Sequence, residues 1–240
     1  ETVDIELTTH EIIYDATSPE VTFVEYPPVL VFENDSDIPV DTECSPESNT
    51  FFDTGRDTTV ICKSKLSDGR IVGWFQGRME YGPRALGTRS ILARATDASI
   101  NESLNNRLSR TEFMPFAPVT MIEYAEECYI GWEPEHFCSE FMTITYDCTD
   151  KAKSQTPATV HVDGTARPQI IDQSKNPEYY GVVKEYHKLS GIPSIINTSF
   201  NNHEEPILCT PEDAVKSILL DNVDVMFVGD FMVKVKKNKN

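Results

Sequence analysis

The stretch Gly77-Arg-Met-Glu-Tyr-Gly-Pro-Arg-Ala-Leu-Gly-Thr-Arg89 contains three glycines, one proline and three arginines, namely Arg78, Arg84 and Arg89. It follows an apolar run, 71–75, that predicts a buried strand. Glycines let the backbone approach a ligand closely, and Pro83 predicts the first turn of a short helix behind Gly82. Guanidinium groups beside a helix N-terminus are suited to phosphate or carboxylate oxygens. The stretch is therefore either an anion-binding loop or a solvated arginine-rich surface.

The composition is typical of a globular protein, because 39% of the 240 residues are apolar, 10% aromatic and 25% charged. This length allows one large domain with a sizeable core, or a domain with an appendage. No apolar run reaches the ~20 residues of a transmembrane helix. The start also lacks the basic and then apolar pattern of a signal peptide. We therefore expect no membrane segment and a cytoplasmic location.

The formal net charge of −18 is unevenly distributed along the chain. Residues 1–50 contain thirteen acidic residues and no Lys or Arg, whereas residues 70–110 contain seven arginines against three acids. The overall acidity argues against non-specific nucleic-acid binding, which requires a basic surface. A local positive region in an acidic protein is better suited to a small anionic ligand.

Six cysteines are spread over the chain: Cys44, Cys62, Cys128, Cys138, Cys148 and Cys209. None forms a CxxC pair, and structural zinc sites use closer spacings than the ten residues that separate the middle three. The five histidines also show no HxxxH pair. We therefore expect reduced, mostly packed cysteines and no metal site in this chain, in agreement with a cytoplasmic setting.

The chain divides into two units. Residues 1–57 form an acidic N-terminal segment with short predicted strands at 21–24 and 29–32 and a linker-like stretch at 33–50. Residues 58–240 alternate predicted strands and helices. This order predicts an α/β domain with a twisted mixed sheet flanked by helices, to which the first unit is an appendage.

Helices are predicted at 58–68, 100–108, 176–189 and 210–220. Strands or extended segments are predicted at 71–75, 88–95, 113–118, 141–146, 159–162, 192–196, 225–228 and 231–235. Ser99 and Glu102 match a capping box at the start of the second helix. Thr210 followed by proline and two acids predicts the start of the last one.

The second unit resembles the NodU/CmcH-type carbamoyltransferases over about residues 58–236. Four blocks occur in the family's order: Gly77–Arg89, Arg110-Thr-Glu-Phe-Met-Pro-Phe-Ala-Pro118, His161-Val-Asp-Gly-Thr-Ala-Arg-Pro-Gln169, and Asn197-Thr-Ser-Phe-Asn201 followed by Glu205-Pro-Ile207. Four ordered blocks at compatible spacings are far more specific than GPRALG alone.

The resemblance implies a YrdC-like C-terminal domain. In that family, this domain takes carbamoyl phosphate and ATP, with Mg²⁺, and forms a carbamoyl adenylate. A separate N-terminal domain with a histidine-based iron site then transfers the carbamoyl group to a small-molecule hydroxyl. Nothing in this sequence matches that half, so the resemblance implies a partner domain or a separate chain, and iron is expected only there.

The resemblance also implies roles for individual residues. Arg84 is expected to contact the oxygens of carbamoyl phosphate, and Arg167 to be a second anion-binding arginine, so both are catalytic candidates. Ser199 matches a contact to a nucleotide phosphate, and Asn197 and Asn201 beside it are candidates to bind backbone or ribose.

Arg78 and Arg89 are candidates for the rim of the same site. Alternatively, Arg84 and Arg167 are structural arginines paired with Glu80 and Asp163, and Ser199 is a turn residue at a strand end. We expect His161 to be structural rather than a catalytic base.

The sequence departs from the family where many members read Lys-x-Arg-Glu-x-Phe-Arg before Pro-Phe-Ala-Pro. Leu108 stands at the position of that Lys and Met114 at the position of the second Arg. Arg107 and Arg110 are candidates to replace them, because one helical step turns a side chain by about 100°.

A second interpretation belongs to another class of function. The acidic first fifty residues and Leu108 are also consistent with a non-catalytic assembly or ligand-binding module, and the sequence leaves homo-oligomerisation open. The two interpretations differ in one geometric expectation. Arg84, Arg167 and Ser199 each follow a strand-like run, so the enzymatic interpretation predicts that they meet in one cleft at the carboxyl ends of strands.

Overall fold

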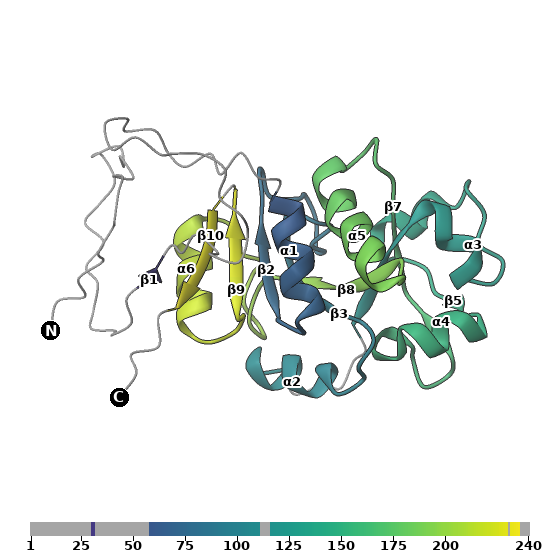
Figure 1. Cartoon of the computed structure of the whole chain (residues 1–240), viewed down its shortest axis with the longest axis horizontal. Helices are drawn as coiled ribbons and strands as arrows, with labels where there is room; N and C mark the ends of the chain where they lie inside the picture. Colours follow the sequence, from purple (N-terminus) through teal and green to yellow (C-terminus); the bar gives the residue numbers. More distant parts are fainter. Residues whose placement is uncertain (1–29, 32–57, 111–115, 230, 236–240) are drawn as a thin grey trace, which may run out of the picture.

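The computed structural model describes residues 30–31, 58–110, 116–229 and 231–235 (Figure 1). Predictions for the rest of 1–57, and for Met114, lie outside these residues. The described chain forms an eight-stranded mixed sheet with helices on both faces, and a small two-stranded sheet beside it. The predicted α/β class is confirmed.

The α-helices are α1 (Thr58–Ser67), α2 (Ile100–Arg107), α3 (Ala125–Cys128), α4 (Asp150–Gln155), α5 (Pro177–Ser190) and α6 (Pro211–Leu219). The 3₁₀-helices are η1 (Ile122–Tyr124), η2 (Phe137–Phe141) and η3 (Pro157–Thr159). The strands are β1 (Leu30–Val31), β2 (Val72–Phe75), β3 (Arg89–Arg94), β4 (Ala117–Met121), β5 (Tyr146–Asp147), β6 (Thr165–Ala166), β7 (Gln169–Ile171), β8 (Ser194–Ser199), β9 (Val225–Val228) and β10 (Phe231–Val235).

The strand order in the large sheet is β1-β10-β9-β2-β3-β8-β4-β7. β3 runs antiparallel to both of its neighbours, β2 and β8, so those two strands point the same way. β4 is antiparallel to β8 and parallel to β7. As a result, β2 and β8 end at the same edge of the sheet at which β4 and β7 begin.

Strand residues alternate between two cores, because successive side chains in a strand point to opposite faces. Trp74, Leu92 and Ile195 belong to the core under α1 and α5, which pack side by side in Figure 1. Phe75 and Ile91 belong to the core on the other face, under α2 and α6. Full burial of one such side chain contributes about 1.5–3 kcal/mol.

A third cluster surrounds the small sheet and joins η1, α3, α4, β5 and β6. Trp132 lies within this side lobe, and its indole Nε1 donates to Ser139 Oγ at 3.0 Å. Tyr129 OH lies 2.8 Å from Thr120 Oγ1 on β4, so buried polar groups tie the lobe to the large sheet.

The predicted helix boundaries are largely confirmed. α5 begins after Asn176, whose side chain accepts from Tyr179 N, and ends at Gly191 with a φ of 73°. α6 begins with a reciprocal capping box between Thr210 and Asp213. The terminal hairpin of β9 and β10 also forms as predicted.

Three local predictions are wrong. Ser99 makes no capping bond to α2, because its hydroxyl donates to Asp97 Oδ1 at 2.7 Å. The strand predicted at 141–146 is reduced to the two residues of β5, after the 3₁₀-helix η2. The strand predicted at 159–162 is replaced by η3 and a turn in which His161 N donates to Thr165 O. The two strands were predicted from β-branched and aromatic residues, but such residues are favoured by packing against neighbours as much as by strand geometry.

None of the helices in the described part of the chain is long and apolar enough to cross a bilayer.

Gly87 ties the loop between β2 and β3, residues 76–88, to the core beneath α5. Its φ is +120°, and a Cβ atom there would lie 2.2 Å from Cδ1 of the buried Tyr179 ring. Gly82 in the same loop has a similar φ of +124°, but a Cβ there would meet nothing within 4 Å. A comparison of substitutions at the two glycines therefore distinguishes the effect of backbone strain from the effect of packing.

We predict that Gly87→Ala lowers the free energy of unfolding more than Gly82→Ala does. Both changes strain a left-handed backbone, at about 1–3 kcal/mol, but only the first also displaces a buried ring, which costs typically a further 1–3 kcal/mol. Urea unfolding of the two variants measures the difference. Equal losses would contradict the packing role of Gly87.

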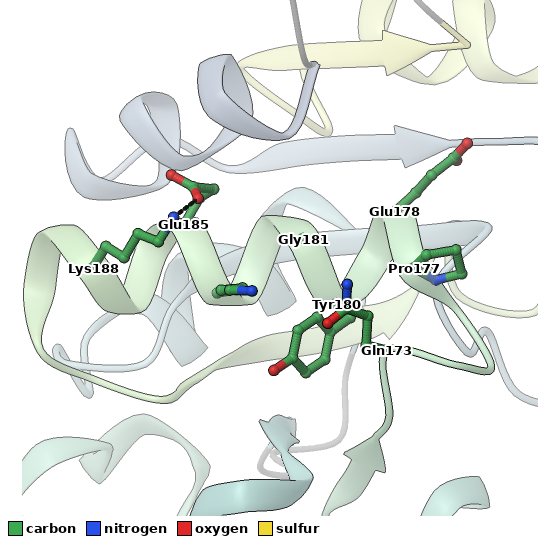
Figure 2. A pocket seen from close by; sticks show the side chains of 8 residues that line it. Gln173, Pro177, Glu178, Tyr180, Gly181, Glu185 and Lys188 are labelled. Atoms are coloured by element: carbon green, nitrogen blue, oxygen red, sulfur yellow. Dashed lines mark hydrogen bonds and ion pairs between the residues drawn. The ribbon is translucent and has the colours of Figure 1, made fainter.

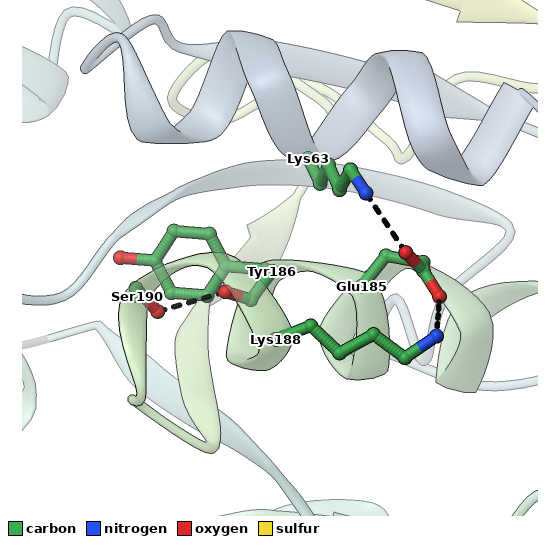
Figure 3. A network of polar contacts seen from close by, with 5 residues as sticks. All are labelled: Lys63, Glu185, Tyr186, Lys188 and Ser190. Carbon is green, nitrogen blue, oxygen red and sulfur yellow. Dashed lines mark hydrogen bonds and ion pairs between the residues drawn. The ribbon is translucent and has the colours of Figure 1, made fainter.

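α1 and α5 are joined by an ion-pair network (Figure 3). Lys63 Nζ on α1 lies 2.8 Å from Glu185 Oε2 on α5, and Lys188 pairs with Oε1 of the same carboxylate. The side chain of Glu185 is 17% exposed. The hydrogen bonds from Lys188 and then Lys63 hold the pKa of Glu185 below its usual range.

We predict that this network stabilises the protein only where Glu185 is ionised. A depressed carboxyl pKa stabilises the fold above the pKa of the unfolded chain, near 4.3, and the contribution is lost as the pH falls through the lower folded pKa. Glu185→Gln should lower the free energy of unfolding by about 0.5–1 kcal/mol at neutral pH and by nothing in acid. In a Lys63→Met, Lys188→Met background, the same substitution should have no effect at either pH.

Candidate functional site

A cleft of about 280 Å³ opens at the sheet edge where β2 and β8 end and β4 and β7 begin. We call it the arginine cleft. Its lining residues are Pro83, Arg84, Ala85, Arg110, Phe116, Ala117, Met142, Arg167, Asn197, Thr198, Ser199, Asn201, His203 and Glu204. The predicted convergence of Arg84, Arg167 and Ser199 on one cleft is thus what the structure shows.

Sheet register brings these distant segments together. Asn197 on β8 pairs with Ala117 on β4, and Val119, two residues further along β4, pairs with Gln169 on β7. By the same register, Arg167, two residues before Gln169, lies opposite Ala117, just before β7 begins. Arg167 lies in the short segment between β6 and β7 and therefore directly follows β6 instead of the strand predicted at 159–162, which does not form.

Three guanidinium groups line the cleft. Arg84 is exposed, whereas Arg110 and Arg167 are partly buried. Burial lowers the pKa of Arg110 and of Arg167, and the nearby Arg84 lowers the pKa of Arg167 further. Within the described residues, none of the three forms an ion pair with a carboxylate. Positive charges that line one cleft without a carboxylate partner favour the binding of an anion between them.

Arg110 is positioned by its neighbours at the cleft wall. Its Nη1 donates to Thr198 Oγ1 at 3.1 Å, and its guanidinium carbon lies 5.6 Å from the centroid of the Phe116 ring. Leu108, where family members carry Lys, is fully buried in the core under α2. Of the two candidate replacements, Arg110 therefore lines the cleft, whereas Arg107 forms an ion pair with Asp224 at 2.9 Å.

The loop 76–88 contains no helix, so the helix predicted behind Gly82 is wrong. The backbone N–H groups of this loop bond to the Glu80 carboxylate, whereas in a helix they would bond to backbone carbonyls. Glu80 Oε1 accepts from Leu86 N at 2.8 Å and from Thr88 N at 2.6 Å. Glu80 thus orders the loop that carries Arg84, instead of pairing with the Arg84 guanidinium.

Amide side chains hold the same loop from the other side. Asn197 Nδ2 donates to Ala85 O at 3.0 Å and to Gln169 Oε1 at 2.7 Å. Gln169 Nε2 donates to Leu86 O at 2.8 Å. Asn197 therefore has a structural role that the sequence did not reveal. Its Oδ1 is buried and lacks a hydrogen-bond partner among the described atoms.

Ser199 and Asn201 lie at the end of β8 and just beyond it. Both are partly buried and line the cleft. Asn201 Nδ2 donates to Asn202 O and Glu205 O, which shapes the turn after β8. The role of each residue as a nucleotide contact remains a prediction.

Arg78 and Arg89 do not line the cleft, contrary to the expectation for its rim. Arg89 is 3% exposed, lies over the Phe75 ring, and donates to the carbonyls of Gln76, Gly77 and Thr88. Burial lowers its pKa, which the Glu80 charge partly offsets. Arg78 is exposed in the loop. The sequence does not show which of the motif's three arginines lines the cleft. The path of the backbone places Arg84 at the cleft, Arg78 in the exposed loop and Arg89 in the core.

Sequence reasoning missed several lining residues, including Phe116, Met142 and Glu204. Met142 and Glu204 have φ values of 55° and 62°, a left-handed conformation that is rare for residues other than glycine. Such strained backbone concentrates at functional sites. Nothing in the sequence at Met142 signals this conformation.

His161 lies outside the cleft, and its Nδ1 is 3.0 Å from Thr165 Oγ1. Asp163 Oδ1 accepts from Thr165 N and Oγ1, so Asp163 orders the turn and, among the described residues, forms no ion pair with Arg167. The expectation of a structural His161 agrees with this geometry. No group of three or more metal-ligating side chains occurs among the described residues.

A second hollow of about 350 Å³ lies along the solvent side of α5 (Figure 2). We call it the α5 shelf; it is lined by Gln173, Pro177, Glu178, Tyr180, Gly181, Lys184, Glu185 and Lys188. Its charges are largely paired, because Glu185 binds two lysines and Lys184 lies 5.8 Å from the Tyr180 ring centroid. The arginine cleft is therefore the candidate site.

Comparison with known proteins identifies relatives of matching sequence. Nodulation protein NolNO of Sinorhizobium fredii is 37% identical over 171 residues, which are 70% of this chain and 25% of that protein. The 3'-hydroxymethylcephem-O-carbamoyltransferase of Streptomyces clavuligerus is 33% identical over 167 residues, which are 70% of this chain and 31% of that protein. The chain thus spans less than a third of the length of these relatives.

A structural relative shares the fold at low sequence identity. The crystal structure of full-length HypF in the phosphate- and nucleotide-bound form has a TM-score of 0.52 and 20% identity, covering 72% of this chain and 25% of that one. The sequence profile of the family described as carbamoyltransferase C-terminus matches residues 63–235. The match includes all three arginines of the cleft, and this chain belongs to the carbamoyltransferase C-terminus family.

Proposed function

We propose that the arginine cleft binds carbamoyl phosphate and ATP and forms a carbamoyl adenylate. The observation that carries this proposal is the convergence of Arg84, Arg110 and Arg167, from three distant segments, on one cleft without carboxylate partners among the described residues. Two ligands with several negative charges repel each other, so cationic groups that never deprotonate are needed to bring them together.

The reaction balances when one water molecule is included. Water cleaves the O–P bond of carbamoyl phosphate, which releases inorganic phosphate and carbamate. A carbamate oxygen then bonds to the α-phosphorus of ATP, while the bond between the α-phosphorus and the bridging oxygen breaks and pyrophosphate leaves. Fixed guanidinium groups stabilise the negative charge on the transferring phosphoryl oxygens without having to reorganise.

Each cleft residue has a proposed role in this chemistry. Arg84 and Arg167 hold the carbamoyl phosphate oxygens, and Arg110 replaces the family's Lys. Ser199 and Asn201 contact the nucleotide phosphate and ribose. A nucleotide-bound Mg²⁺ needs one or two carboxylates besides phosphate oxygens, and Glu204 at the cleft would provide one.

The transfer step would require a second unit. Because the chain spans less than a third of the length of the two relatives named above, we propose that an N-terminal domain or a separate chain carries the iron site and the small-molecule hydroxyl acceptor. This chain alone would then stop at the adenylate. The cleft is suited to small anions and not to a nucleic acid, since its positive charge is local.

We predict that the protein releases pyrophosphate from ATP only when carbamoyl phosphate is present. Arg84→Ala and Arg167→Ala should each lower this rate about 10²-fold or more, because each removes a fixed cationic donor at the reacting phosphates. Arg70→Ala is the matched control, since Arg70 is exposed before β2 at the opposite edge of the sheet. A coupled pyrophosphate assay gives the three rates, and a loss in Arg70→Ala equal to the others would contradict the proposal.

We further predict that ATP stabilises the protein through the cleft arginines. At a free concentration of 100 Kd, bound ligand raises the free energy of unfolding by about 2.7 kcal/mol. The Arg84→Ala, Arg167→Ala double variant should lose most of this gain, which thermal melting with and without ATP measures. Stabilisation without pyrophosphate release would favour the alternative, a non-catalytic ligand-binding module. Unperturbed melting in the presence of ATP would contradict nucleotide binding altogether.

A further inference from the structure

The backbone of residues 85–88 receives its hydrogen bonds largely from side chains. Leu86 N and Thr88 N donate to Glu80, while Ala85 O and Leu86 O accept from Asn197 and Gln169. Asn197 and Gln169 also bond to each other at 2.7 Å. We call this chain of contacts, from Ala85 O through Asn197 and Gln169 to Leu86 O, the amide relay.

The amide relay is almost completely buried. Gln169 is 3% exposed and Asn197 is 1% exposed. Each buried amide or carbonyl group left without a hydrogen-bond partner lowers the stability of the fold by about 1–3 kcal/mol. Displacement of the loop would leave several such groups unpaired at once. The relay therefore holds the loop in one position more firmly than exposed hydrogen bonds would.

The relay also connects the three segments that carry cleft residues. Gln169 begins β7 two residues after Arg167, Asn197 lies on β8 two residues before Ser199, and both bind the loop directly after Arg84. Arg84 and Arg167 repel each other across the cleft. The relay tethers the backbone next to Arg84 to the strand that begins two residues after Arg167.

We infer that Gln169 is a positioning residue for Arg84: its amide, joined to Asn197, holds Leu86 O and thereby sets the distance between the Arg84 and Arg167 guanidinium groups. This inference rests on the proposed anion-binding function of the cleft. Gln169 is not among the residues that line the cleft, so it acts through Arg84 and not by touching the ligand.

The test uses inorganic pyrophosphate as a bridging anion and the 240-residue chain. Gln169→Met keeps the side-chain length but removes both amide contacts, and should raise the Kd for pyrophosphate, measured by calorimetry, about ten-fold or more. Gln76→Met is the matched control: Gln76, at the start of the same loop, is 7% exposed, does not line the cleft and donates Nε2 to Gly229 O at 3.0 Å. Its Kd should stay within about two-fold of the original.

A double-mutant cycle distinguishes positioning from a general loss of stability. In an Arg84→Ala background, Gln169→Met should change the Kd less than about two-fold, because the group that it positions is gone. An undiminished ten-fold effect in that background, or an unchanged Kd in Gln169→Met alone, overturns the inference. A general structural role would instead lower the melting temperature of both Met variants and leave the Kd of the folded protein unchanged.

Gln169→Asn covers the case in which the Met variant does not fold. This substitution keeps a buried amide, but the side chain is shorter by one methylene group, so the amide no longer reaches Leu86 O. We expect a rise in Kd that again disappears in the Arg84→Ala background. Failure of the proposed enzyme activity has a different signature, since pyrophosphate would bind with the predicted pattern while no ATP-dependent release occurred.

Discussion

Residues 85–88, the last part of the loop between β2 and β3, are buried or partly buried without forming a helix or a strand, so their backbone groups depend on side chains for hydrogen bonds. Glu80 supplies the acceptors and the Asn197–Gln169 pair supplies the donors. Gly87 lets this backbone lie directly against Tyr179. Because unpaired buried N–H and C=O groups are strongly unfavourable, these bonds favour the observed path of the loop, which places Arg84 at the cleft and Arg89 in the core.

The electrostatics of the cleft follow from this arrangement. The protein as a whole carries a formal charge of −18, yet Arg84, Arg110 and Arg167 lie around one hollow at the sheet edge. Their shared field is local, and burial strengthens it because fewer water molecules screen the charges. The same three side chains would repel one another without an anion, which is why a rigid scaffold matters more here than at a single-arginine site.

Much of the fold was accessible from local sequence signals. The caps at Asn176, Gly191 and Thr210 predicted α5 and α6 because they satisfy end groups within a few residues. The failures at 159–162 and Ser99 share a cause: polar groups there find partners close by in the chain, Thr165 and Asp97, that periodicity does not reveal. Leu108, which stands where many family members carry Lys, directly follows α2 and is buried in the same core as Leu104.

The sequence by itself determined the family, the α/β class and the arginine, serine and asparagine residues from which a site had to be built, because ordered motifs and helix caps are local patterns. Only the tertiary structure decided which arginines share the cleft. Arg84, Arg110 and Arg167 meet because β3 reverses direction between β2 and β8 and so aligns strand ends far apart in the chain. Arg89 and Arg107 carry the same charge, but carbonyls and Asp224 engage them elsewhere, since hydrogen-bond partners distant in sequence set the direction of each side chain.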